Sequence, residues 1–167
     1  MRLTRYLKPQ QIKLEIATRT PTEIPEGMSR ERFVNDIKES VLREIVALHD
    51  ASGNVSNTSK LFTDMWNREK KATTAVGDGI AIPHVRTMQA REFTLAFARS
   101  TEGVEFAAID GEPVHFFFSV IAPPHNDALY LKVYKEMATI FGSETKVQAL
   151  AAARNEHEII KILSDFS

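Results

Sequence analysis

Hydrophobic side chains recur along this chain with two periods, one typical of strands and one typical of helices. Apolar residues alternate with other side chains over residues 12–16 and 92–99, which is the period of a half-buried strand. Residues 114–121 form the most apolar run and predict a central strand. Helical spacing and capping residues predict five helices, over about residues 29–49, 58–71, 126–141, 143–154 and 155–165.

A glycine-rich stretch after the second predicted helix ends in a histidine. Gly77 and Gly79 flank an aspartate and permit positive φ angles, so they predict a turn. Residues 80–82 are apolar and predict a short buried strand. Pro83 fixes its own φ and keeps the preceding residue extended, so the strand is expected to stop there. His84 then stands at the end of a strand, where α/β proteins commonly place reactive groups.

The predicted order of elements is β-α-α-β-β-β-α-α-α, with loops or turns over residues 85–91, 104–106 and 109–113. A small sheet with this many helices is best covered on both faces. We therefore predict an α/β fold with three layers, α/β/α, around a small mixed β-sheet. No repeat, linker or low-complexity segment interrupts residues 1–167, so we expect a single domain.

Composition and charge narrow the classes of function. The net charge is −1 and no long basic block occurs, so we expect no nucleic-acid binding and no polybasic membrane docking. The chain has no cysteine, and no apolar run approaches the roughly 18–20 residues of a membrane span. Residues 1–9 lack the apolar core of a secretory signal. These features predict a cytoplasmic protein without direct membrane insertion, and the histidine spacing does not indicate a metal site.

Several motifs together resemble one family. Residues 67–70 (NREK) precede residues 77–84 (GDGIAIPH), and residues 103–106 (GVEF), 108–114 (AIDGEPV) and an apolar strand ending at Pro123 follow. This arrangement resembles the EIIA domains of the fructose–mannitol class (type 2) of the phosphotransferase system, which include the nitrogen-regulatory IIA proteins. The resemblance covers nearly the whole chain and is weakest before residue 60. The combination of arginine–glutamate with the glycine–isoleucine–proline–histidine stretch is specific.

The resemblance implies a mixed sheet between helices and a phosphotransferase activity without a cofactor. Members of this family accept a phosphoryl group from a phosphorylated HPr-type carrier on the histidine that matches His84. Members that serve transporters pass the group to a cysteine of a IIB domain. Members of the nitrogen-regulatory type mostly use their phosphorylation state to control the binding of partner proteins.

The chemistry suits the matched residues. Imidazole has an ordinary pKa near ~6.5, so a neutral His84 offers one nitrogen lone pair to phosphorus. Phosphoryl transfer needs positioning and positive charge around the phosphoryl oxygens. In the family, the arginine that matches Arg68 lies beside the reactive histidine, and a guanidinium can hold phosphate with two hydrogen bonds. Backbone N–H groups of the glycine turn are a further set of candidate donors.

One position departs from the family pattern. Many members carry a second histidine in a His-Leu pair, where this chain has Tyr130-Leu131. A tyrosine donates a hydrogen bond but does not become cationic, so phosphohistidine stabilisation is expected to rely more on Arg68. His125, on the preceding loop, is an alternative that would also need to reach the site.

The other polar candidates have structural interpretations. His115 lies in an apolar strand and is expected to be a hydrogen-bonded core or sheet-face residue. His49 and His157 lie near helix ends and are expected to be solvated, and Asp78 is expected to complete a turn.

Three hypotheses about function remain open. The first is a histidine phosphocarrier with His84, Arg68 and Tyr130 at its site. The second is a regulatory binding protein whose partner is selected by His84 phosphorylation. The third is a scaffold that keeps the fold without the chemistry, for which the tyrosine in place of histidine is the motive.

Overall fold

The computed structural model describes residues 3–164. Its helices are α1 (Arg30–Asp50), α2 (Thr58–Lys71), α3 (Asp127–Phe141), α4 (Glu144–Ala152) and α5 (Glu156–Ser164), and two short 3-10 turns (Leu3–Arg5 and Pro9–Gln11) precede them. The strands are β1 (Ile12–Lys13), β2 (Ala75–Gly77), β3 (Ile80–Ala81), β4 (His84–Arg86), β5 (Thr94–Val104) and β6 (Val114–Ala122). The predicted end of the last helix, near Asp165, lies outside the described residues.

The sheet is mixed, as predicted. Its order is β1-β5-β6-β3-β2, and β4 also pairs with β6. The long strands β5 and β6 form an antiparallel pair, whereas β3 and β4 run parallel to β6 and follow each other along one of its edges. Strand β6 is therefore the centre of the fold, and it sets the positions of both short strands that flank Pro83.

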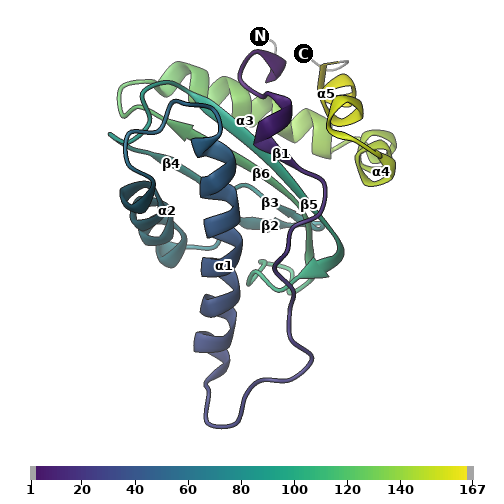
Figure 1. Ribbon diagram of the computed structural model, residues 1–167. Helices are drawn as coiled ribbons and strands as arrows, with labels where there is room; N and C mark the ends of the chain where they lie inside the picture. Colours follow the sequence, from purple (N-terminus) through teal and green to yellow (C-terminus); the bar gives the residue numbers. More distant parts are fainter. Residues whose placement is uncertain (1–2, 165–167) are drawn as a thin grey trace.

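Helices cover both faces of this sheet (Figure 1), so the predicted three-layer α/β/α fold is confirmed. Successive residues of β6 point to opposite faces. Phe117 and Ile121 pack in the cluster that contains the apolar stripe of α1 and residues of α2. Phe116, Phe118 and Val120 pack instead in the cluster that contains α3, α4 and α5. Within the described residues, no helix is both long and apolar enough to cross a membrane.

The structure differs from the sequence prediction in several strands. His84 begins a separate strand, β4, which also takes in residues 85 and 86 of the predicted loop, because β6 offers this segment a parallel partner with His84 opposite Val120. Strand β5 continues beyond Arg99 to Val104, which pairs with Val114. Strand β2 was not predicted, and β1 is only two residues long. Short strands with few apolar residues depend on a partner strand for their backbone hydrogen bonds, so local pattern alone does not reveal them.

The prediction that His49 is solvated is wrong. Its side chain is 0% exposed, and Nε2 lies 2.8 Å from the hydroxyl oxygen of Ser119. Position 49 is four residues after the buried Ile45, so it belongs to the apolar face of α1. The predictions for His115 and His157 are confirmed: Nδ1 of His115 is bonded to the carbonyl of Ser100 at 2.9 Å, and His157 is exposed.

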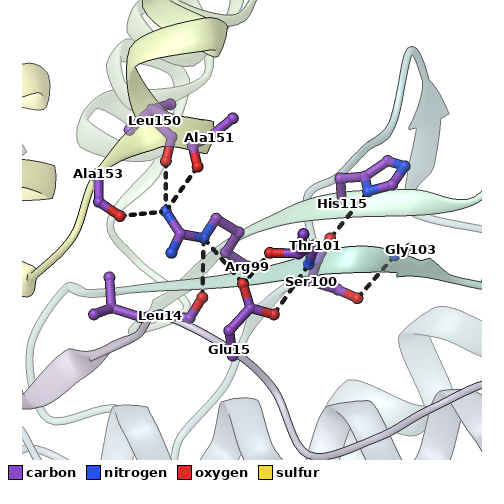
Figure 2. A network of polar contacts seen from close by, with 10 residues as sticks. All are labelled: Leu14, Glu15, Arg99, Ser100, Thr101, Gly103, His115, Leu150, Ala151 and Ala153. Atoms are coloured by element: carbon purple, nitrogen blue, oxygen red, sulfur yellow. Dashed lines mark hydrogen bonds and ion pairs between the residues drawn. The ribbon is translucent and has the colours of Figure 1, made fainter.

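One buried arginine joins the amino-terminal segment to the carboxyl end of α4. Arg99 is 9% exposed, and its guanidinium donates to five oxygen atoms from both segments (Figure 2). Its partners are the carbonyls of Leu14 (3.0 Å), Leu150 (2.8 Å), Ala151 (3.3 Å) and Ala153 (2.8 Å) and the carboxylate of Glu15 (3.3 Å). The last carbonyls of a helix have no partner within it, so Arg99 satisfies the end of α4.

Candidate functional site

The three side chains predicted from the sequence line one open cavity of about 860 Å³. Arg68 enters it from α2, His84 from the start of β4, and Tyr130 from the first half of α3. The remaining lining residues come from α2, from β4 and the loop after it, and from the loop after β6: Asp64, Asn67, Lys71, Val85, Arg86, Thr87, Met88, Gln89 and Pro124. Residues far apart in the chain thus meet at the carboxyl end of β6.

The His84 ring is held by the backbone beside it. Its Nδ1 lies 2.6 Å from the carbonyl oxygen of Ile82. A carbonyl oxygen only accepts, so Nδ1 carries the proton, and the neutral ring has its lone pair on Nε2. Burial lowers the pKa of His84, and the positive charge of Arg68 lowers it further, although the bond to Ile82 opposes both. The neutral, nucleophilic form is therefore favoured at neutral pH.

Arg68 occupies the last turn of α2. Its Nη1 donates to the carbonyl of Ala72 at 2.9 Å, a contact that turns the guanidinium back over the end of the helix. The neighbouring residue, Glu69, is buried and accepts from the backbone N–H of Thr74 at 2.6 Å, so the helix end is tied to the segment that leads into β2. These contacts at the end of α2 limit the positions that the Arg68 guanidinium can occupy.

Two tyrosines on α3 pack against the histidine. The Tyr130 ring centroid lies 5.8 Å from that of His84, and the Tyr134 centroid lies 5.2 Å from it. Burial raises the pKa of Tyr130 to about 12, and burial also raises that of Tyr134, so both hydroxyls keep their protons. The Tyr134 hydroxyl is buried, and the neighbouring Tyr130 helps to raise its pKa. Sequence reasoning missed Tyr134, although its spacing of four residues from Tyr130 places both on one helix face.

Arg86 is a second residue that sequence reasoning missed. It lies in β4, where it forms an ion pair with Asp127 at the start of α3, and its guanidinium carbon is 5.9 Å from the Tyr130 ring centroid. Together with Arg68 and Lys71 it gives the cavity three cationic side chains. Its position two residues after the histidine was visible in the sequence, but only the pairing of β4 with β6 turns this segment into a wall of the site.

The proposed donors from the glycine turn do not reach this cavity. Ile80 pairs with Phe116 and His84 pairs with Val120, so the two positions are four residues apart along β6, roughly 13 Å. The turn itself is as predicted: Asp78 has a φ of 57° and its backbone N–H donates to the Asp110 carboxylate at 2.9 Å.

His125, the alternative second histidine, is exposed and does not line the cavity. Of these two candidates for the second site residue, Tyr130 is therefore the one that lines the cavity. Within residues 3–164, no three histidine, aspartate or glutamate side chains gather closely enough to hold a metal ion.

Known proteins match this chain in sequence and in fold. Residues 32–166 match the family described as phosphoenolpyruvate-dependent sugar phosphotransferase system, EIIA 2. A nitrogen regulatory protein of Bradyrhizobium diazoefficiens is 31% identical over 140 residues, which cover 84% of this chain and 90% of that protein. The fructose-specific EIIABC component of Bacillus subtilis is 29% identical over 164 residues, which cover 98% of this chain but only 23% of that longer protein.

Solved structures agree with these relatives. The nitrogen regulatory protein IIA-Ntr of Neisseria meningitidis superposes with a TM-score of 0.78 at 25% identity, covering 96% of this chain and 98% of that one. The IIA mannitol protein of Escherichia coli has the same fold, with a TM-score of 0.70 at 19% identity over 94% of this chain and 98% of its own. The resemblance expected from the motifs is confirmed, and the chain belongs to the EIIA type 2 family of the phosphoenolpyruvate-dependent sugar phosphotransferase system.

Proposed function

We propose that residues 1–167 act as a single IIA unit that carries a phosphoryl group on Nε2 of His84. The observation that carries this proposal is the 2.6 Å contact between Nδ1 and the Ile82 carbonyl, since it leaves the Nε2 lone pair free. Membership of the EIIA family supports phosphotransfer as the general activity. The donor is a phosphorylated HPr-type carrier, as the family resemblance implies.

The transfer step balances without a cofactor. The Nε2 lone pair forms a bond to phosphorus while the bond between phosphorus and the donor breaks, and that electron pair stays with the donor. His84 keeps its Nδ1 proton, so the ring becomes cationic as the bond forms. The Ile82 carbonyl then faces this cationic ring and stabilises it, because the hydrogen bond becomes charge-assisted.

The cationic side chains of the cavity suit the negative oxygens of a phosphoryl group. Arg68 and Arg86 present guanidinium groups from two different elements, and Lys71 adds a point charge. Tyr130 contributes a hydroxyl that stays protonated at neutral pH because its pKa is raised to about 12. We assign Arg68 the role of principal phosphate ligand and Tyr130 that of a neutral hydrogen-bond donor.

Mass spectrometry tests this proposal. We expect the protein to gain one acid-labile phosphate when it is incubated with phosphoenolpyruvate, enzyme I and an HPr-type carrier. His84→Gln should gain none, and His157→Gln, which alters an exposed histidine outside the cavity, should behave as the parent. The proposal fails if the parent remains unlabelled, which would favour the scaffold hypothesis, or if His84→Gln is still phosphorylated.

The onward step has two candidate forms. One is transfer to the cysteine of a IIB domain, and its support is the fructose-specific relatives. The other is regulation of a partner protein by the phosphorylation state, and its support is the 31% identical nitrogen regulatory protein. Incubating the phosphorylated protein with a cognate IIB separates them: loss of the label to the IIB cysteine supports transfer. Retention of the label, with a partner captured in only one phosphorylation state, supports regulation.

A further inference from the structure

A buried polar chain connects α1 to the backbone beside His84. The His49 Nε2 atom lies 2.8 Å from the Ser119 hydroxyl, and that hydroxyl donates to the Pro83 carbonyl, also at 2.8 Å. Both side chains are 0% exposed. The chain therefore runs from α1 to the sheet and ends on the peptide group that leads directly into the reactive histidine.

The chemistry of the acceptor assigns each proton. A carbonyl oxygen only accepts hydrogen bonds, so the Ser119 hydroxyl donates its only proton to the Pro83 carbonyl. Ser119 must then accept from His49, which places the His49 proton on Nε2 and the lone pair on Nδ1. That Nδ1 is buried and has no hydrogen-bond partner in the described part of the chain. Burial lowers the pKa of His49 to about 3, so the ring stays neutral at neutral pH.

This arrangement is not one that stability alone favours. A buried acceptor without a partner is unfavourable, and an apolar side chain at position 49 would remove it. Places where a sequence breaks such a local rule are commonly functional. The one hydrogen bond of His49 connects it, through Ser119, to the segment that holds His84.

The Ile82 N–H donates to the Thr74 carbonyl at 2.9 Å and β4 pairs with β6, so backbone hydrogen bonds hold both sides of Pro83. Pro83 has no N–H, so the segment between β3 and β4 has one backbone donor fewer to hold it. The Pro83 carbonyl accepts from the Val120 N–H at 3.0 Å and from Ser119, and two donors together fix the plane of the peptide that continues into His84. The orientation of that peptide decides whether the His84 ring can keep its bond to Ile82.

We propose that His49 and Ser119 are positioning residues for His84, which hold the Pro83 peptide so that the His84 proton stays on Nδ1 and its lone pair on Nε2. The kinetic part of this inference rests on the proposed phosphocarrier function, whereas the tautomer of His84 does not. Neither residue touches the transferred group, because both are fully buried and neither lines the cavity.

Nitrogen-15 NMR of the imidazole rings tests the positional part in the unphosphorylated protein. The His84 signals are identified by their loss in His84→Gln. We expect the parent to show His84 as the Nδ1-protonated tautomer, and Ser119→Ala and His49→Leu to show averaged shifts from two exchanging tautomers. His49→Gln retains a neutral N–H donor for Ser119 and should restore the parental shifts. Unchanged His84 shifts in both Ser119→Ala and His49→Leu would overturn the proposal, whether or not the protein is ever phosphorylated.

Transfer kinetics supply the second readout. At saturating phosphorylated carrier, we expect Ser119→Ala and His49→Leu to slow phosphorylation about tenfold with KM for the carrier unchanged, since the docking surface is untouched. His49→Gln should lie within about twofold of the parent. If Ser119→Ala does not fold, His49→Leu carries the test.

A matched control separates positioning from the loss of any buried hydroxyl. Ser100 is also buried in a strand, and its hydroxyl accepts from the Gly103 N–H at 3.0 Å (Figure 2). It lies near the Phe116 end of the sheet, roughly 13 Å along β6 from the level of His84. Ser100→Ala should leave the rate and the His84 tautomer as in the parent. An equal slowing in Ser100→Ala and Ser119→Ala would overturn the proposal.

Discussion

Replacing Arg68 with alanine should separate catalysis from stability. Among the described residues, the guanidinium makes one hydrogen bond, to the Ala72 carbonyl at 2.9 Å, at an exposed helix end. Such a contact contributes about 1 kcal/mol or less to the free energy of unfolding. For a domain of this size, 1 kcal/mol corresponds to a change in Tm of roughly 2–4 °C. The fold should therefore survive the substitution almost unchanged.

Phosphoryl transfer should suffer far more. Removing one preorganised donor from a site of developing negative charge costs about 100- to 1,000-fold in rate, or about 2.7–4 kcal/mol. Arg86 and Lys71 remain in the cavity and keep the loss near the lower end of that range. Arg68→Lys keeps a charge but not the two-pronged geometry, so it should recover only part of the rate.

The same substitution should move the pH dependence. Arg68 is one cause of the lowered pKa of His84, so Arg68→Ala should raise that pKa toward its ordinary value. The neutral form is lost as pH falls through the pKa of the folded protein, and the variant should lose its rate at a higher pH than the parent. Rapid-quench measurements between pH 5 and 8, with NMR titration of His84, test both effects. A parental rate, or a loss of rate matched by a large fall in Tm, would refute the role given to Arg68.

Three further predictions concern other parts of the molecule. Arg99→Ala should lower the free energy of unfolding by about 3 kcal/mol, because it strands buried carbonyls at the end of α4, while His84 labelling at low temperature persists; urea denaturation checks this. The pKa of His49 is about 3 in the folded state and near ~6.5 when unfolded, so the unfolded state binds a proton first as pH falls. The parent should therefore lose about 2 kcal/mol of unfolding free energy between neutral pH and pH 5. His49→Leu should lack this loss, and an equal dependence of unfolding free energy on pH in both proteins would contradict the prediction. Tyr130→Phe should slow transfer about tenfold with little change in Tm, because it removes the proposed hydroxyl donor and keeps the ring; an unchanged rate would exclude that donor role.

The local patterns of the sequence predicted the elements with strong periodicity. Helices α1 and α2 lie where their apolar spacing predicted them, and the Ser29 hydroxyl accepts from the Arg32 N–H as a helix cap does. The central strand β6 was visible as the most apolar run. These elements were predictable because their burial depends mainly on their own side chains. Strands β2 and β4 were not, because their hydrogen bonds come from β3 and β6.

For the candidate site too, the sequence predicted some features and the tertiary structure decided others. The sequence alone predicted His84, Arg68 and Tyr130 as site residues, because a motif with specific spacing contains the first two and a departure from that motif marks the third. It also supported neutral imidazole chemistry, since that follows from residue type. Which nitrogen is free was a matter of geometry, and only the position of the Ile82 carbonyl assigned it.

Tertiary structure alone decided what surrounds the histidine. The register of β3 and β4 on β6 moved the glycine turn away from His84, and the pairing of β4 brought in Arg86. Packing of α3 over the site added Tyr134, and packing of α1 against β6 buried His49 beside Ser119. These contacts join residues tens of positions apart, and a local pattern carries no information on them. The sequence by itself determines the chemistry of each side chain, whereas the distances between side chains and their burial arise only when the sheet packs between its two helical layers.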